Sequence, residues 1–212
     1  MPDPSTAPPE SRGERKERTR RAILDAALAL CEESSMAALS LRQVAKEVGI
    51  VPTAFYRHFE SLESLGLALV DESFVSLRAM LRDVRRSDPS HEDIIDGSIQ
   101  TLVDHVHAQR SHFAFIARER AAGPPLVRRA IRHEIELCER ELATDLARLP
   151  GNESWSSEDL QVLANLMVMA MVATAEAILA ASPRPEIEQQ IIETARTQLR
   201  MVLVGAVNWR SS

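Results

Sequence analysis

Residues 40–59 read Ser-Leu-Arg-Gln-Val-Ala-Lys-Glu-Val-Gly-Ile-Val-Pro-Thr-Ala-Phe-Tyr-Arg-His-Phe. Ser40 and Gln43 have the S-x-x-Q spacing of a capping box, which predicts the start of a helix. Gly49 suits the left-handed turn that ends a helix, and Pro52 suits the first turn of the next one. Two short helices joined by such a turn follow the helix-turn-helix plan for the DNA major groove.

The apolar residues of this stretch predict which side of each helix is buried. In the first helix they recur on one face at Leu41, Val44, Ala45 and Val48. In the second they give an inward side of Ala54, Phe55 and Phe59. Hydroxyl groups suit phosphate oxygens, and an Arg side chain reaches a phosphate or a guanine edge. We therefore expect DNA contacts from the outward polar residues Arg42, Thr53, Tyr56, Arg57 and His58.

The stretch resembles the DNA-binding domain of the TetR family of transcriptional regulators over roughly residues 15–85. The resemblance is carried by Tyr56-Arg57-His58-Phe59, which matches the Tyr-x-His-Phe pattern at the end of the family's recognition helix. It implies a homodimer on a palindromic operator, with Tyr56 and His58 at positions that touch the DNA backbone. Many members carry a phosphate-binding Lys at the start of the next helix. Here that position is Leu62, so we expect no contact there.

A narrower resemblance is to the branch of fatty-acid regulators that contains FabR and DesT. It rests on Leu65-Gly66-Leu67, on Val70-Asp71-Glu72-Ser73 and on Arg118-Glu119-Arg120. The branch implies a long-chain fatty acid or acyl-CoA effector and lipid-metabolism target genes. Such a ligand needs an apolar tunnel with cationic groups near its anionic end. From this resemblance we expect a pocket lined by Val103, Val106, Phe113, Ile116, Arg118, Met167 and Met171.

The charge distribution supports a nucleic-acid partner despite a net charge of −6. Residues 12–21 contain six basic and two acidic residues, whereas the excess of acidic residues lies in 61–212. Because phosphate attraction is screened beyond about 8–10 Å, this local excess is what DNA would meet. We therefore add Arg18 and Arg20 to the expected DNA contacts.

Composition and helix breakers predict an all-α fold of about nine helices in 212 residues. The chain has 45% hydrophobic residues, 4% aromatic residues and only 7 Gly. The predicted parts are a disordered Pro-containing arm (1–12), a helix-turn-helix DNA-binding domain (13–60), a connecting helix (61–88), and a ligand-binding and dimerisation domain (89–212). Helical patterns run over 14–33, 61–86, 91–109, 111–122, 124–149, 156–181 and 185–209.

The last two helices suit self-association, since each carries an apolar stripe. Packed across a two-fold axis, the stripes would make a four-helix interface. The alternative, that one monomer buries both stripes, stays open. The residues expected at the interface are Leu163, Leu166, Ala170, Leu199, Val202, Ala206 and Trp209.

Other classes of protein fit less well. The apolar run 162–181 approaches membrane-spanning length, but Asn165, Thr174 and Glu176 interrupt it, so we expect a soluble cytoplasmic protein. The histidines lack metal-ligand spacing, and no catalytic or cofactor motif is present, so we expect no metal, no cofactor and no enzymatic activity. Two alternatives remain open. One is a repressor of an efflux or degradation gene that senses drugs or other xenobiotics. The other is a helical lipid-binding protein without specific DNA binding.

Overall fold

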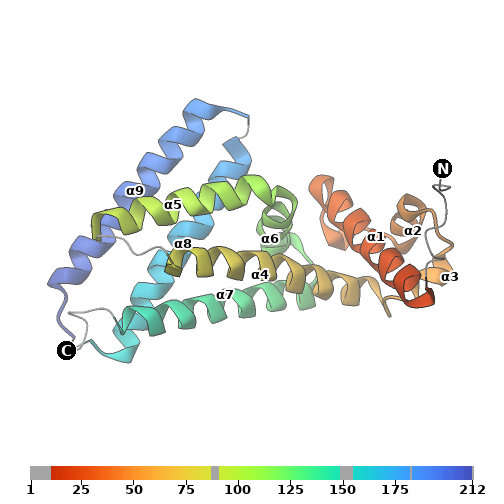
Figure 1. Cartoon of the computed structure of the whole chain (residues 1–212), viewed down its shortest axis with the longest axis horizontal. Helices are drawn as coiled ribbons and strands as arrows, with labels where there is room; N and C mark the ends of the chain where they lie inside the picture. Colours follow the sequence, from red (N-terminus) through yellow and green to blue (C-terminus); the bar gives the residue numbers. More distant parts are fainter. Residues whose placement is uncertain (1–10, 87–90, 149–154, 182, 212) are drawn as a thin grey trace, which may run out of the picture.

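The computed structural model describes residues 11–86, 91–148, 155–181 and 183–211, and all regular structure within these ranges is helical. This confirms the predicted all-α class (Figure 1). The described elements are α1 (Arg12–Glu33), a 3-10 turn η1 (Met36–Ala38), α2 (Leu41–Val48), α3 (Pro52–Phe55), α4 (Leu62–Arg86), α5 (His91–Ala108), α6 (Arg110–Ala122), α7 (Pro125–Leu146), α8 (Ser157–Ala181) and α9 (Pro185–Asn208).

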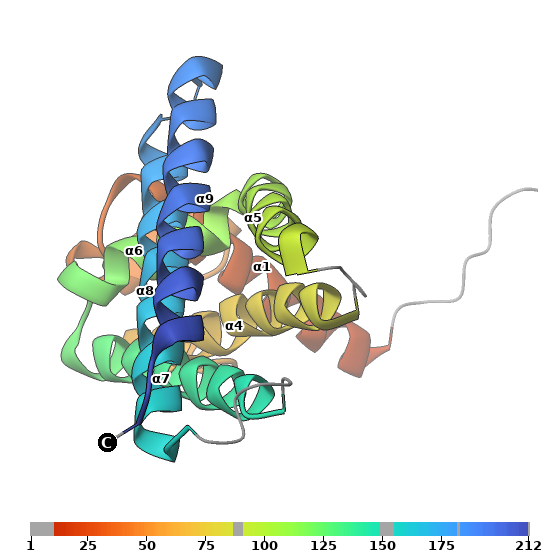
Figure 2. The ribbon, with the colours of Figure 1, turned by 90° about the vertical axis from the view of Figure 1, so that its left-hand side faces the viewer.

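The helices form two parts joined by α4. The head, comprising α1, η1, α2 and α3, gathers at one end of the molecule (Figure 1). The body comprises α5 to α9, and α4 runs from the head along α7 into it. Figure 2 shows α8 and α9 side by side across one face of the body. The head is therefore presented at the opposite end from the α9 C-terminus.

Local sequence signals set the ends of the head helices. Ser40 Oγ accepts from Gln43 N–H, and the Gln43 side chain accepts from Ser40 N–H at 2.8 Å, which is the predicted capping box. Gly49 closes α2 with φ of 73°, a conformation that costs glycine little. A second capping box, between Ser11 and Glu14, starts α1 at Arg12, two residues before the expected start. Of the arm predicted over 1–12, residues 1–10 lie outside the described part of the chain.

Two apolar clusters account for most of the core. The first joins the head to α4, α6 and α7, with Ile23, Phe55, Leu65, Phe74, Phe115 and Ile131 almost fully buried. The second lies in the body between α5, α6, α8 and α9. Because Phe113 belongs to the second cluster and Phe115 to the first, α6 connects the two.

Helix α8 is long and apolar enough to cross a membrane by length and composition alone. In the structure it packs against α5, α6, α7 and α9 instead. Its polar residues are also used within the fold, because Asn165 donates to Glu139 of α7 and Glu176 pairs with Arg120 of α6. This packing is that of a core helix with one uncovered apolar side.

Candidate DNA-binding face, effector core and dimer face

The outward side of α2 and α3 carries the polar residues expected to contact DNA. Arg42, Thr53, Tyr56 and Arg57 are all exposed, and the Tyr56 side chain is 61% exposed. Their apolar neighbours Phe55 and Phe59 are buried, so the predicted division of the motif into two faces is present. Helix α3 ends at Phe55, after which Tyr56, Arg57 and His58 form a turn. The structure thus leaves four hydrogen-bonding side chains of α2, α3 and the following turn accessible to solvent.

His58 departs from the expected outward orientation. It is half-buried, and its Nδ1 atom is buried without a hydrogen-bond partner among the described residues. Burial lowers the pKa of its imidazole, and the nearby charges of Lys16, Arg20 and Arg57 lower it further. Arg20 of α1 holds the backbone carbonyl of His58, and the next residue, Phe59, is buried, so His58 lies against the head. His58 is therefore in part a packing residue.

Arg20 is likewise engaged inside the head. Its guanidinium donates to the backbone carbonyl of His58 at 3.0 Å and lies 4.3 Å from the centroid of the Phe59 ring. These contacts hold His58 and Phe59, which follow α3, against α1. Arg18, two residues earlier on α1, is exposed. Of the two basic residues expected to contact DNA, Arg18 has the more accessible side chain.

Val51, which was not among the expected contacts, immediately precedes α3 and is 63% exposed. An apolar residue this exposed at the start of a recognition helix suits contact with a thymine methyl group. The signal was present in the Val51-Pro52-Thr53 order, because Pro52 at the first turn fixes the preceding residue outside the helix.

The expected ligand-binding residues divide between two places. Val103, Val106 and Phe113 are buried together in the body cluster, with Met167 and Met171 packed against them. We name these five residues the effector core. Ile116 packs instead against the head cluster. Arg118 is directed to α1, where it donates to the carbonyl of Cys31 at 2.7 Å. Hydrophobic periodicity did not predict this division, because adjacent sides of α6 pack against different clusters.

The expected dimer residues also divide. Leu163 and Leu199 are buried within the chain, and Ala170, Val202 and Ala206 are half-buried. Leu166 and Trp209 are about half exposed, at 52% and 51%. The outward apolar side is rotated slightly from the predicted stripe, and we name it the α8–α9 face. Its exposed members are Val162, Leu166, Met169, Met201, Val204, Val207 and Trp209.

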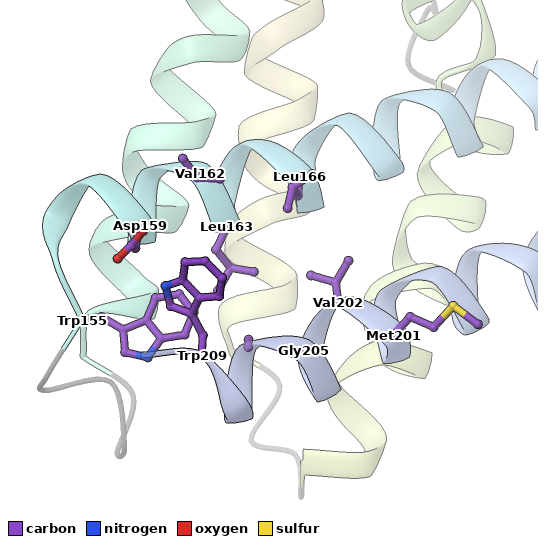
Figure 3. A pocket seen from close by; sticks show the side chains of 10 residues that line it. Trp155, Asp159, Val162, Leu163, Leu166, Met201, Val202, Gly205 and Trp209 are labelled. Carbon is purple, nitrogen blue, oxygen red and sulfur yellow. The ribbon is translucent and has the colours of Figure 1, made fainter. Parts of the chain in front are cut away.

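A hollow of about 310 Å³ lies at one end of this face (Figure 3). Trp155, Asp159 and Trp209 line one end of the hollow, and Gly205 forms part of its wall. The Asp159 carboxylate accepts from the hydroxyls of Ser211 and Ser156, and hydrogen bonds from Ser211, Trp209 and Ser156 lower its pKa. The C-terminal residues are thereby fastened to the start of α8, which fixes Trp209 at the edge of the hollow.

No group of three or more potential metal ligands occurs among the described residues. The histidines that invite a metal interpretation have other contacts. His107 Nε2 lies 3.0 Å from Glu188, and His112 Nδ1 lies 3.0 Å from Ser73 Oγ.

Comparison with known proteins gives matches in both parts of the chain. Residues 23–69 match the model for "Bacterial regulatory proteins, tetR family", and residues 91–204 match the model for "Tetracyclin repressor-like, C-terminal domain". Similar solved structures include a TetR-family transcriptional regulator from Streptomyces coelicolor, at 18% identity and a TM-score of 0.68, covering 91% of this chain and 97% of that one. GusR of Salmonella enterica is 22% identical with a TM-score of 0.67, covering 88% of this chain and 95% of that one. Both likenesses show the fold.

Proposed function

Because this chain belongs to the TetR family of transcriptional regulators, whose members bind DNA and are not enzymes, we propose that it is a cytoplasmic homodimeric repressor of a palindromic operator. Its effector is an apolar small molecule bound in the body. The observation that carries the proposal is the pairing of one exposed polar face on the head with one uncovered apolar face on the body. The first suits DNA, and the second suits another copy of the chain.

Exposure and charge support the assignment of the DNA-binding face. Arg42 and Arg57 supply positive charge, while the Thr53 and Tyr56 hydroxyls supply donors for phosphate oxygens. Arg18 adds a further charge from the basic start of α1. The excess of acidic over basic residues that gives the chain its net charge of −6 lies in residues 61–212. Attraction to phosphate therefore acts where the head meets the duplex.

The α8–α9 face supports dimerisation. Leu166, Met201 and Val204 are 52%, 70% and 66% exposed, on two helices that pack against each other. Several exposed apolar side chains on two packed helices suit an interface with another protein surface. A two-fold axis through it would place two heads on one duplex, and heads about 34–36 Å apart would read successive major grooves. It would also cover the uncovered side of α8.

The effector core supports an apolar ligand. Methionine side chains adapt to ligands of varied shape, and Met167 and Met171 pack against buried Val and Phe side chains. A long-chain fatty acid or acyl-CoA is the first candidate, with lipid-metabolism genes as targets. A second candidate is an uncharged apolar xenobiotic. It is favoured because the Arg118 guanidinium donates to the Cys31 carbonyl of α1 and is therefore not directed into the effector core, where it could pair with an anionic ligand.

Fluorescence anisotropy on DNA from upstream of the gene, titrated with long-chain acyl-CoA at fixed salt, tests the proposal. We expect specific binding that the acyl-CoA weakens, while coenzyme A alone leaves it unchanged. Binding that responds to a long-chain alcohol but not to acyl-CoA would favour the uncharged effector. Absence of specific binding would contradict the repressor assignment for that operator. A reporter gene under the same promoter gives the sign of regulation, and loss of expression on deleting the protein would exclude repression.

A further inference from the structure

The junction between head and body contains a buried carboxylate. Glu119 of α6 is 0% exposed, and both of its oxygens accept hydrogen bonds from the head. Oε1 accepts from the backbone N–H of Met36 at 2.9 Å, and Oε2 shares the Ser35 hydroxyl with the Ala122 carbonyl, each at 3.1 Å. A carboxylate removed from water is costly unless such donors compensate it. The position of η1 and the stability of this carboxylate therefore depend on each other.

The Met36 side chain packs against α4 close to α7. Its side chain is 3% exposed. A Cβ atom added to Gly66 of α4 would lie 2.6 Å from the Met36 sulfur and 2.8 Å from a Val127 methyl of α7. The absence of a side chain at Gly66 is thus what lets η1 approach α4 and α7. Glu119 holds the backbone of the same residue.

Gly123 makes room for the carboxylate. It ends α6 with φ of −68°, which any residue adopts, so backbone strain does not demand glycine here. A Cβ atom at this position would lie 2.6 Å from Oε2 of Glu119 and 2.6 Å from its backbone oxygen. Glycine at 123 is required by the space that Glu119 occupies.

Helix α6 also contacts the head through Arg118, the residue before Glu119. It contacts the body through Phe113 and Arg120. Arg118 donates to the Cys31 carbonyl in the last turn of α1. Phe113 lies in the effector core, and Arg120 pairs with Glu176 of α8 at 2.8 Å. One rigid helix thus holds both sides of the turn between α1 and η1 and takes part in the effector core.

We propose that Glu119 is a positioning residue for DNA binding, because its grip on Met36 sets the orientation of the head on the body. The inference rests on the proposed function, because the orientation of the head matters only if the head binds an operator. Arg118 supports the same orientation from the end of α1.

The test measures head orientation without DNA or effector. Spin labels are placed at Lys46→Cys on α2 and Arg132→Cys on α7, both exposed positions, and the label-to-label distance is measured in protein diluted with unlabelled chain. The native Cys31 and Cys138 are buried, and burial raises the pKa of the Cys31 thiol to about 12, so labelling favours the introduced sites.

Glu119→Ala is expected to broaden or shift the distance distribution, and Glu119→Gln to restore it. The amide oxygen still accepts from Met36 N–H, and the amide NH₂ donates to the Ser35 hydroxyl. Glu139→Ala is the matched control, since it also removes a buried carboxylate, one held by Asn165 on α8 and not by the head. Should Glu119→Ala fail to fold, Gly123→Ala displaces the same carboxylate and is expected to change the distances in the same direction.

Operator affinity provides the second measurement. Glu119→Ala is expected to lose about tenfold in specific affinity and to keep its affinity for random DNA, because the charges of the head are unchanged. An unchanged distance distribution in Glu119→Ala or Gly123→Ala overturns the proposal, whatever the melting temperature. If the wild type itself finds no operator, the proposed function fails, whereas the distance measurement still decides the role of Glu119.

Discussion

Ser73 Oγ lies 3.0 Å from Nδ1 of His112, so that α4 and α6 are joined by a hydrogen bond near the head. The Ser73 hydroxyl already donates its own proton to the Leu69 carbonyl at 2.7 Å. Nδ1 of His112 must therefore carry the hydrogen and donate it. This arrangement leaves Nε2 directed toward the Glu72 carboxylate at 3.7 Å, and Glu72 also pairs with Arg21 of α1.

The first prediction concerns stability against pH. Burial lowers the pKa of His112 below its ordinary 6.5, an effect that Glu72 and Asp25 oppose and Arg21 reinforces. The unfolded chain therefore binds this proton more tightly than the folded one. The contribution of neutral His112 to stability is fully present above pH 6.5 and is lost as pH falls through the lowered pKa. The melting temperature should fall less between pH 7 and pH 5 in His112→Asn than in the wild type.

Asn suits this test because its amide can still donate to Ser73. His133→Asn, at an exposed position on α7, serves as the control for removal of an imidazole. Equal pH dependence in His112→Asn and the wild type would show that this histidine is not a source of acid sensitivity.

The second prediction concerns the DNA-binding face. Arg57 is exposed, so Arg57→Ala should leave the melting temperature unchanged while weakening operator binding. If Arg57 neutralises one phosphate, the slope of log K against log salt should become shallower by about 1. Anisotropy at several salt concentrations measures the slope. Arg129→Ala, an exposed arginine on α7, should keep the wild-type slope, and a common change in both variants would indicate a bulk charge effect instead.

The third prediction separates Arg20 from such contacts. Because Arg20 donates to the His58 carbonyl and lies over the Phe59 ring, its removal should destabilise the head by about 1–3 kcal/mol. Arg20→Ala should lower the midpoint of urea unfolding, and Arg20→Lys should recover part of the loss. A wild-type midpoint with weakened operator binding would instead assign Arg20 to phosphate.

The sequence predicted the head well because its signals are local. The Ser40–Gln43 capping box and the Gly49 turn each depend on neighbours within a few residues, and both are present. Contacts between distant residues were not predictable in the same way. Glu119 meets Met36 across 83 positions, and no periodicity marks a helical carboxylate as buried. Arg118, expected near an effector, meets Cys31 for the same reason.

Which side of α8 faces outward could also not be predicted from the sequence. Helix α8 is apolar nearly all round, so hydrophobic spacing cannot choose which side faces the chain's own core. Tertiary packing buries Leu163 and leaves Leu166 outward. The sequence therefore predicted both helices, whereas which of their residues face outward is determined by tertiary packing.

The fourth prediction concerns this face. Val204 is 66% exposed on α9, and dimerisation through the α8–α9 face would bury it. Val204→Asp should therefore convert a dimer to a monomer in sedimentation velocity, since a buried unpaired carboxylate costs several kcal/mol at an interface. The monomer should retain its helical content, because Val204 contributes little to the core of one chain. Val75→Asp on α4 is a matched control, being 59% exposed away from this face, and should remain dimeric. A dimer that survives Val204→Asp, or is equally lost in Val75→Asp, would place the interface elsewhere and remove the proposed reason for the apolar outer side of α8.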